Sequence, residues 1–335
     1  KTPARGVALE ALHPVRGAHR GPALRVLELV AKDKACEHKD KACHGQSCPL
    51  ASGFYDKLPA AREAAAQAQW LDQAALRAIA REHQVCPYYL GHDMVRWADA
   101  VVGDYNYYFD RTAMLYALTV ESAWRVSVLV DEAHNLYSRA CAMYSAQITQ
   151  AEAVAVRPQV PGPIRPRVDE LLNQWQLLLD ALQRSAPGKP WHVLDELPED
   201  WARTLQKLNA TVGEYLNDHP TETHGALLPF YFGTLAFAAL AQEAGEHSMC
   251  EVDVTVPAVT PVLASDATQL GLDAAAFDDA ALCAGTLTLR NIVPASFIAQ
   301  RIKAADSMVL FSATLNPPDY YMDLLGLPDT TQMLD

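Results

Sequence analysis

An apolar run that ends in two acids is the feature that most constrains the fold. Residues 126–130 read VSVLV, and Asp131 and Glu132 follow at once. A continuous apolar run of this length is typical of a central strand in a parallel sheet, buried on both faces. In α/β proteins, ligands bind at the carboxyl edge of such sheets. We therefore expect an α/β fold with a ligand site at the acidic pair.

The residues around this pair suit nucleotide chemistry. In VLVDEAHNL, residues 128–136, one carboxylate can hold Mg²⁺ and the next can orient or deprotonate a water. His134 follows three residues after Asp131, where it can sense the state of the site. The alternative is a helix N-terminus at which acids interact with the macrodipole. A second strand-like run with small hydroxyl residues, VLFSATL at 309–315, favours the nucleotide interpretation.

Four of the seven cysteines fall within the first 86 residues, with the spacing C-x(6)-C-x(4)-C-x(37)-C. An odd cysteine count without a signal peptide argues against a disulfide framework. Thiolates are soft ligands that suit zinc and iron–sulfur clusters. Three hypotheses follow from the spacing: reduced thiols, a zinc site that includes His38 or His44, or an iron–sulfur cluster. The four residues are Cys36, Cys43, Cys48 and Cys86.

Charge is distributed unevenly along the chain. The net charge is −13, which excludes a generic nucleic-acid binder, but residues 1–88 hold 13 Lys and Arg against 9 Asp and Glu. A polyanion is therefore expected to meet the first quarter of the chain. In this part of the chain, the basic residues expected to contact phosphates are Lys32, Lys34, Lys39, Lys41, Lys57, Arg62, Arg77 and Arg81. The aromatic residues expected to stack on bases are Phe54, Tyr55, Tyr88 and Tyr89. The alternatives are a solvated mixed-charge face and aromatic packing within a small domain.

Periodicity predicts the remaining organisation. Residues 58–82 form a strongly helical stretch, and 100–102 read as a short strand. The middle of the chain is mainly helical, with apolar stripes that predict core helices. The longest apolar run, 227–241, is too short to span a bilayer, so we expect a buried helix. With no signal peptide, the protein is expected to be cytoplasmic.

Taken together, these motifs resemble XPD/DinG-type (DEAD_2) superfamily 2 DNA helicases. The features shared are DEAH after a strand, SATL after a later strand, and a four-cysteine insert before DEAH. Residues 86–110 resemble the family's link from the last cluster cysteine to the DEAH strand, and 290–318 resemble its approach to the SAT motif. Residues 43–65 resemble bacterial DinG-like members of the family more than its eukaryotic repair subunit. The resemblance covers nearly the whole chain, most weakly at 140–285.

The resemblance implies roles for individual residues. Asp131 would bind the metal of Mg-ATP, Glu132 would be the catalytic base, and His134 would couple hydrolysis to movement. The motif that links nucleotide state to DNA would be Ser312, Ala313 and Thr314. The four early cysteines would ligate a [4Fe–4S] cluster. The expected DNA contacts are Lys32, Tyr105, Asn106 and Tyr107.

The family also implies a domain order. Residues 1–31, 89–138 and 286–335 would form part of the first RecA-like motor domain. A small, mainly α iron–sulfur domain, 32–88, and a mainly α arch domain, 139–285, would be inserted in it. The expected fold is thus α/β, a partial RecA-like parallel sheet with two insertions.

The implied function is an ATP-dependent 5′–3′ DNA helicase that moves on single-stranded DNA and unwinds forked duplexes in DNA repair, with no membrane partner. The sequence contains no G-x-x-x-x-G-K-[ST], so the chain alone is expected not to hydrolyse ATP. Because a second RecA-like domain is also missing, we expect an excised fragment. The alternatives are a metal-stabilised nucleic-acid or protein-binding module without motor activity, and a zinc structural protein. The sequence indicates no protein partner.

Overall fold

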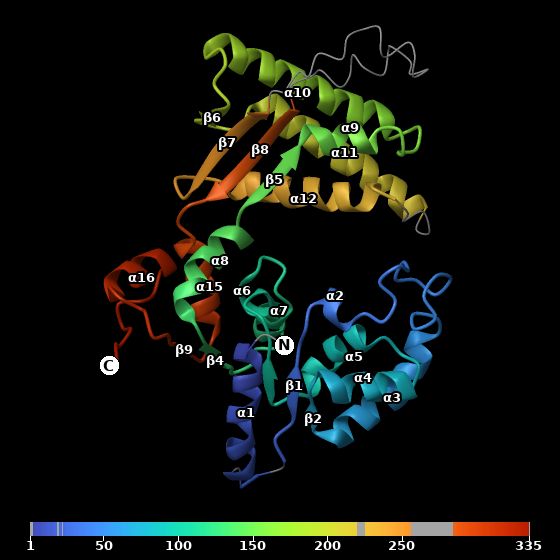
Figure 1. Cartoon of the computed structure of the whole chain (residues 1–335), viewed down its shortest axis with the longest axis vertical. Helices are drawn as coiled ribbons and strands as arrows, with labels where there is room; N and C mark the ends of the chain where they lie inside the picture. The colour runs from blue at the N-terminus through green and yellow to red at the C-terminus, as the bar shows by residue number, and fades with distance from the viewer. Residues whose placement is uncertain (1–2, 19, 22, 220–224, 256–283, 335) are drawn as a thin grey trace, which may run out of the picture. The chain divides into compact units, whose positions relative to one another are not determined.

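The computed structural model describes residues 3–18, 20–21, 23–219, 225–255 and 284–334. The chain divides into two compact units, both visible in Figure 1. The first unit contains Lys1–Leu136, Ile298–Tyr321 and Gln332–Asp335. The second contains Tyr137–Phe297 and Met322–Thr331. Cys283 and part of the expected arch domain lie outside the described residues.

The first unit is built on parallel strands, which confirms the α/β prediction. Strand β1 (Val26–Glu28) lies between β2 (Trp70–Leu71) and β3 (Ala100–Val102), and both neighbours run parallel to it. All three residues of β1 are buried, as expected of a strand with partners on both sides. The helices of this unit are α1 (Pro3–Ala18), α2 (Lys32–Ala35), α3 (Phe54–Ala68), α4 (Gln73–Glu82), α5 (Pro87–Met94), η1 (Val95–Trp97), α6 (Asn106–Phe109), α7 (Met114–Glu121) and η2 (Ala133–Asn135).

The helical stretch predicted at 58–82 is interrupted, and this part of the prediction is wrong. Gln69 ends α3 in the left-handed region, with φ 60°, and its carbonyl accepts from the Val26 amide at 2.8 Å. Asp72 then caps α4 by accepting from the Ala75 amide at 2.8 Å. Pairing with β1 thus overrides the helix propensity of an Ala- and Gln-rich segment.

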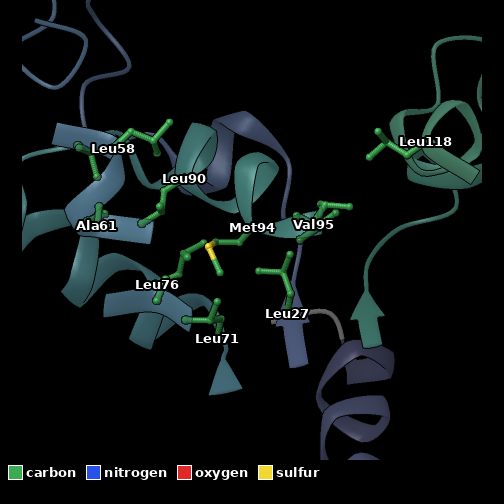
Figure 2. Packing of buried hydrophobic residues seen from close by; sticks show 13 residues of the cluster. Leu27, Leu58, Ala61, Leu71, Leu76, Leu90, Met94, Val95 and Leu118 are labelled. Atoms are coloured by element: carbon green, nitrogen blue, oxygen red, sulfur yellow. The ribbon is translucent and has the colours of Figure 1, made fainter. Parts of the chain in front are cut away.

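One apolar core joins the cysteine region to the sheet. Figure 2 shows Leu58, Leu76 and Leu90, from α3, α4 and α5, gathered with Leu27 of β1. Ala61 is fully buried on α3, and a side chain this small lets neighbouring helices approach closely. Residues 32–88 therefore obtain part of their stability from the sheet, which a segment of this length needs.

A second pair of parallel strands contains the two motifs. Strand β4 (Ser127–Val130) pairs with β9 (Ser307–Leu310), with Val130 opposite Leu310. The expectation of a buried central strand is wrong for β4, because Leu129 is 70% exposed. In the part of the chain that the structure describes, β9 is the one strand that pairs with β4, so the other edge of β4 is unpaired.

The second unit combines an antiparallel sheet with long helices. Its strand order is β5–β8–β7–β6 (Figure 1). The strands are β5 (Ala146–Thr149), β6 (Trp191–Leu194), β7 (Ser248–Thr255) and β8 (Ala284–Asn291). The main helices are α9 (Gln150–Val156), α10 (Arg165–Ser185), α11 (Glu199–Asp218) and α12 (Leu227–Glu243). Three further helices, α8 (Leu136–Met143), α15 (Ala295–Ala304) and α16 (Pro318–Leu325), each contain residues of both units.

The core of this unit follows the predicted helical stripes. Trp175 of α10 and Trp201 of α11 are buried, with ring centroids 4.9 Å apart and planes at 88°. Gly285 of β8 lies against Trp175, where a Cβ would come within 2.6 Å of the indole ring. Among the described helices, α12 included, none is both long and apolar enough to cross a bilayer.

Candidate functional site

The two motif strands bring their polar tails to one edge of their sheet. The Phe311 amide donates to the Val130 carbonyl at 3.0 Å, and the Ala133 amide donates back to the Phe311 carbonyl at 3.1 Å. The backbone ladder therefore continues beyond both strands. It fixes the acidic turn after β4 beside the small hydroxyl residues after β9.

His134 and Ser312 are in direct contact at this edge. The imidazole Nδ1 of His134 lies 2.7 Å from the Ser312 hydroxyl and 3.3 Å from the Glu132 carboxylate. The Ser312 hydroxyl also accepts from the Thr314 amide at 3.3 Å, so the SAT loop, with Ala313 at its centre, folds around that oxygen. A shift of the carboxylate can thus reach the SAT loop through a single ring.

The acidic turn has an unusual backbone. Glu132 has φ 49° and ψ 44°, the left-handed conformation, which costs a residue with a side chain about 1–2 kcal/mol. The Glu132 amide donates to the Asp131 carboxylate at 2.8 Å, and the Asn135 amide donates to the Glu132 carbonyl at 2.9 Å. Strain of this kind is found most often at functional sites.

Two of the four residues expected to contact DNA, Tyr105 and Tyr107, donate their hydroxyl protons within the protein. The Tyr105 hydroxyl donates to the backbone carbonyls of Asp131 and Glu132, at 2.9 Å for the latter. The Tyr107 hydroxyl donates to the Val30 carbonyl at 2.8 Å, and burial raises the pKa of Tyr107 to about 12. Asn106 is the first residue of α6. Their DNA contacts stay predictions.

The four early cysteines line one pocket, together with Lys32 and Tyr89. It contains about 350 Å³ of unfilled space, part of it open to solvent. Cys36 ends α2 and Cys86 directly precedes α5, while Cys43 and Cys48 lie on the irregular loop between α2 and α3. All six cysteines of the described residues are free thiols. The fold therefore gathers at one place four soft ligands that are up to 50 positions apart.

The surroundings of the Cys86 thiol shift its pKa in opposite directions, and the net shift is upward. Burial raises the pKa of the Cys86 thiol, and the nearby Cys36 and Cys43 raise it further. The backbone amides of Tyr89 and Tyr88 donate to its sulfur and oppose that rise. The Lys32 ammonium donates to the Cys43 sulfur, which raises the pKa of Lys32. Donors and a cation thus already point at the sulfurs.

The pocket is not closed around a single ion. Among the described residues, no three His, Cys, Asp or Glu side chains are grouped to hold one metal ion. Zinc binds sulfur at about 2.3 Å, so a mononuclear site requires its ligands to converge tightly. Four thiols around one pocket suit an iron–sulfur cluster in their chemistry, and the ligand assignment remains a prediction.

The side chains expected to meet DNA divide into two groups. Arg62 forms a bidentate ion pair with Asp93, with N–O distances of 2.7 and 2.9 Å, and Arg77 pairs with Glu37 at 3.3 Å. Each of these two arginines thus has an acidic partner within the protein, and its DNA contact stays a prediction. Near the pocket, Tyr55 is 83% exposed and Tyr89 is 42% exposed. Their rings are accessible for stacking.

One buried ionic group has no motif in the sequence. Arg5 of α1 is 7% exposed and lies 3.4 Å from both Glu28 of β1 and Asp104, the residue before Tyr105. Glu28 also accepts from the Gln73 amide, at the start of α4, at 2.9 Å. Alternating polar and apolar residues do not reveal a buried arginine, so sequence reasoning missed it.

Comparison with known proteins agrees with this architecture. Residues 23–153 match the DEAD_2 family model. The chain is similar to a solved structure described as "XPD_Helicase", with TM-score 0.53 and 13% identity, over 97% of this chain and 51% of that one. It is also similar to "Truncated XPD", with TM-score 0.52 and 14% identity, over 100% of this chain and 85% of that one.

These matches confirm the resemblance to XPD/DinG-type helicases that the motifs predict. At such low identity, the structural likeness shows the fold alone. The chain spans about half the length of the "XPD_Helicase" chain. No curated protein matches it.

Proposed function

We propose, from its likeness in motifs and fold to XPD/DinG-type helicases, that the chain is part of an ATP-dependent 5′–3′ DNA helicase. The whole enzyme would move on single-stranded DNA and unwind forked duplexes. The observation that supports this best is the joint geometry of the first unit. The acidic turn contacts the SAT loop through His134 and Ser312, and the same unit contains the four-cysteine pocket.

In this proposal each residue at the sheet edge has a separate task. Asp131 holds the magnesium that accompanies ATP, and Glu132 accepts a proton from the attacking water. His134 transmits the state of Glu132 to Ser312 through the 2.7 Å and 3.3 Å contacts. The sequence has no phosphate-binding loop of the G-x-x-x-x-G-K-[ST] type, so the chain by itself is expected not to hydrolyse ATP.

The four pocket cysteines would ligate a structural [4Fe–4S] cluster. Such a cluster would bind the α2–α3 loop to α5 and so stabilise a segment with a small core. The shared pocket of the four cysteines supports this, as do the amides that donate to the Cys86 sulfur and the ammonium that donates to the Cys43 sulfur. The cytosol keeps cysteine thiols reduced, and a cluster requires reduced cysteines as its ligands.

A second candidate is a metal-stabilised nucleic-acid or protein-binding module without motor activity. The four-cysteine pocket supports it, because a bound metal would stabilise residues 32–88 with or without a motor. Zinc in the same pocket is a further alternative, with the same four cysteines as its ligands.

The deciding experiment is anaerobic purification followed by metal analysis and visible absorption. We expect a brown protein with about four irons per chain, since a [4Fe–4S] cluster absorbs visible light and zinc does not. Colourless protein with one zinc would contradict the cluster. Binding to single-stranded and forked DNA is then measured by fluorescence anisotropy at several salt concentrations, because phosphate contacts weaken steeply with salt. A protein that binds neither DNA would contradict the helicase proposal.

A further inference from the structure

Tyr105 contacts the backbone of the acidic turn, which its place in the sequence does not suggest. Its hydroxyl donates to the carbonyls of Asp131 and Glu132, 26 and 27 positions further along the chain. Those two carbonyls belong to the peptides on either side of the left-handed residue Glu132. A hydroxyl shared by both oxygens restrains the rotation of these two peptides.

Tyr105 is itself held in place by rigid neighbours. It caps α6, where its carbonyl accepts from the Phe109 amide at 2.8 Å, and its ring meets Phe109 edge-on at 6.4 Å. The preceding residue, Asp104, pairs with the buried Arg5. A side chain fixed on both sides can determine the geometry of the groups that it touches.

We propose that Tyr105 is a positioning residue that sets the orientation of the Asp131 and Glu132 carboxylates by holding the backbone of their turn. Its catalytic consequence rests on the proposed ATPase function. The carboxylate of a general base must lie within hydrogen-bond reach of the attacking water. If the turn relaxes, the Glu132 side chain moves away from that position, while residues that bind ATP elsewhere are unaffected.

Two tyrosine-to-phenylalanine variants test this role. Tyr105→Phe removes the hydroxyl and keeps the ring. Tyr107→Phe is the matched control, because its hydroxyl donates to the Val30 carbonyl at 2.8 Å and not to the acidic turn. In Tyr105→Phe, we expect the amides of residues 132–135 to exchange hydrogen about three- to tenfold faster, as the loss of one hydrogen bond implies. In Tyr107→Phe, the exchange of these amides should match that of the wild type.

The exchange rates of residues 132–135 are compared with those of helix α7 in the same unit. A general loss of stability raises both and therefore does not affect the outcome. Unchanged protection of 132–135 relative to α7 in Tyr105→Phe would overturn the inference, as would an equal loss in Tyr107→Phe. In the complete enzyme, Tyr105→Phe should lower kcat about tenfold and raise KM for ATP by a smaller factor, through the displaced Asp131 carboxylate. An enzyme whose kcat is insensitive to this change would also overturn it. If the wild-type enzyme hydrolyses no ATP, the proposed function fails, and the exchange result alone decides the role of Tyr105.

Discussion

His134 and Ser312 are 178 positions apart in the chain, yet the imidazole nitrogen and the hydroxyl oxygen are 2.7 Å apart. The parallel pairing of β4 with β9 determines this contact, because it places the residues after both strands at one edge. A change in the position of the acidic turn can therefore reach the SAT loop directly, with no other helix or strand between them.

Removal of the Ser312 hydroxyl should weaken the coupling between the acidic turn and the SAT loop. In the complete enzyme, we expect Ser312→Ala to reduce the stimulation of ATP hydrolysis by DNA at least about fivefold, the lower end of typical coupling between sites. The control is Ser307→Ala, which removes a hydroxyl of β9 that contacts the Ser127 hydroxyl at 2.8 Å. Steady-state ATPase assays with and without single-stranded DNA measure the effect. Equal stimulation in Ser312→Ala and wild type would show that the contact transmits nothing.

Substitution of one pocket cysteine should remove the cluster. We expect Cys86→Ser to lose iron and visible absorption, to increase proteolysis of residues 32–88, and to weaken DNA binding. The reason is that Cys86 anchors α5 at the pocket. Cys141→Ser, in the second unit, is the control and should keep full iron content. Full iron and unchanged protease resistance in Cys86→Ser would mean that the ligand assignment is wrong.

The buried Arg5 should contribute strongly to stability. Arg5→Met keeps the apolar stem but leaves Glu28 buried without its cation, which we expect to lower the free energy of unfolding by about 3 kcal/mol. Arg125→Ala is the control, because its pair with Asp306 lies at the surface and its removal should have no measurable effect. Urea titrations followed by circular dichroism compare the variants. A loss in Arg5→Met no larger than in Arg125→Ala would contradict the prediction.

His92 should make stability depend on pH. Burial lowers the pKa of its imidazole below the ordinary 6.5, so the unfolded chain binds the proton more readily than the folded one. Stability is therefore full above the unfolded pKa, falls as the pH drops below about 6.5, and becomes constant again below the folded pKa. The groups around His92 are the rings of Tyr88 and Tyr107, with Glu28 and Arg77 lining the same pocket.

The measurement for His92 is the free energy of unfolding from about pH 7.5 to about pH 5 in wild type and His92→Gln. We expect a smaller decline in the variant. Because each protein is compared with itself across pH, any constant cost of the substitution cancels. Parallel curves would show that the protonation of His92 does not affect folding.

The sequence by itself determined the local features of this protein. Apolar runs followed by polar tails predicted β4 and β9, and periodic apolar positions predicted α10 and α11, because burial on one face imposes a regular spacing.

Only the tertiary structure decided which distant groups touch. The helical stretch at 58–82 is interrupted because β1 pairs with residues 70–71. Helix propensity is a local property and does not take that pairing into account. Arg5, Glu28 and Asp104 meet because α1 packs beside the sheet. Tyr105 reaches the acidic turn across 26 positions. Such contacts depend on how separate elements approach in space, and the pattern within one element does not encode that approach.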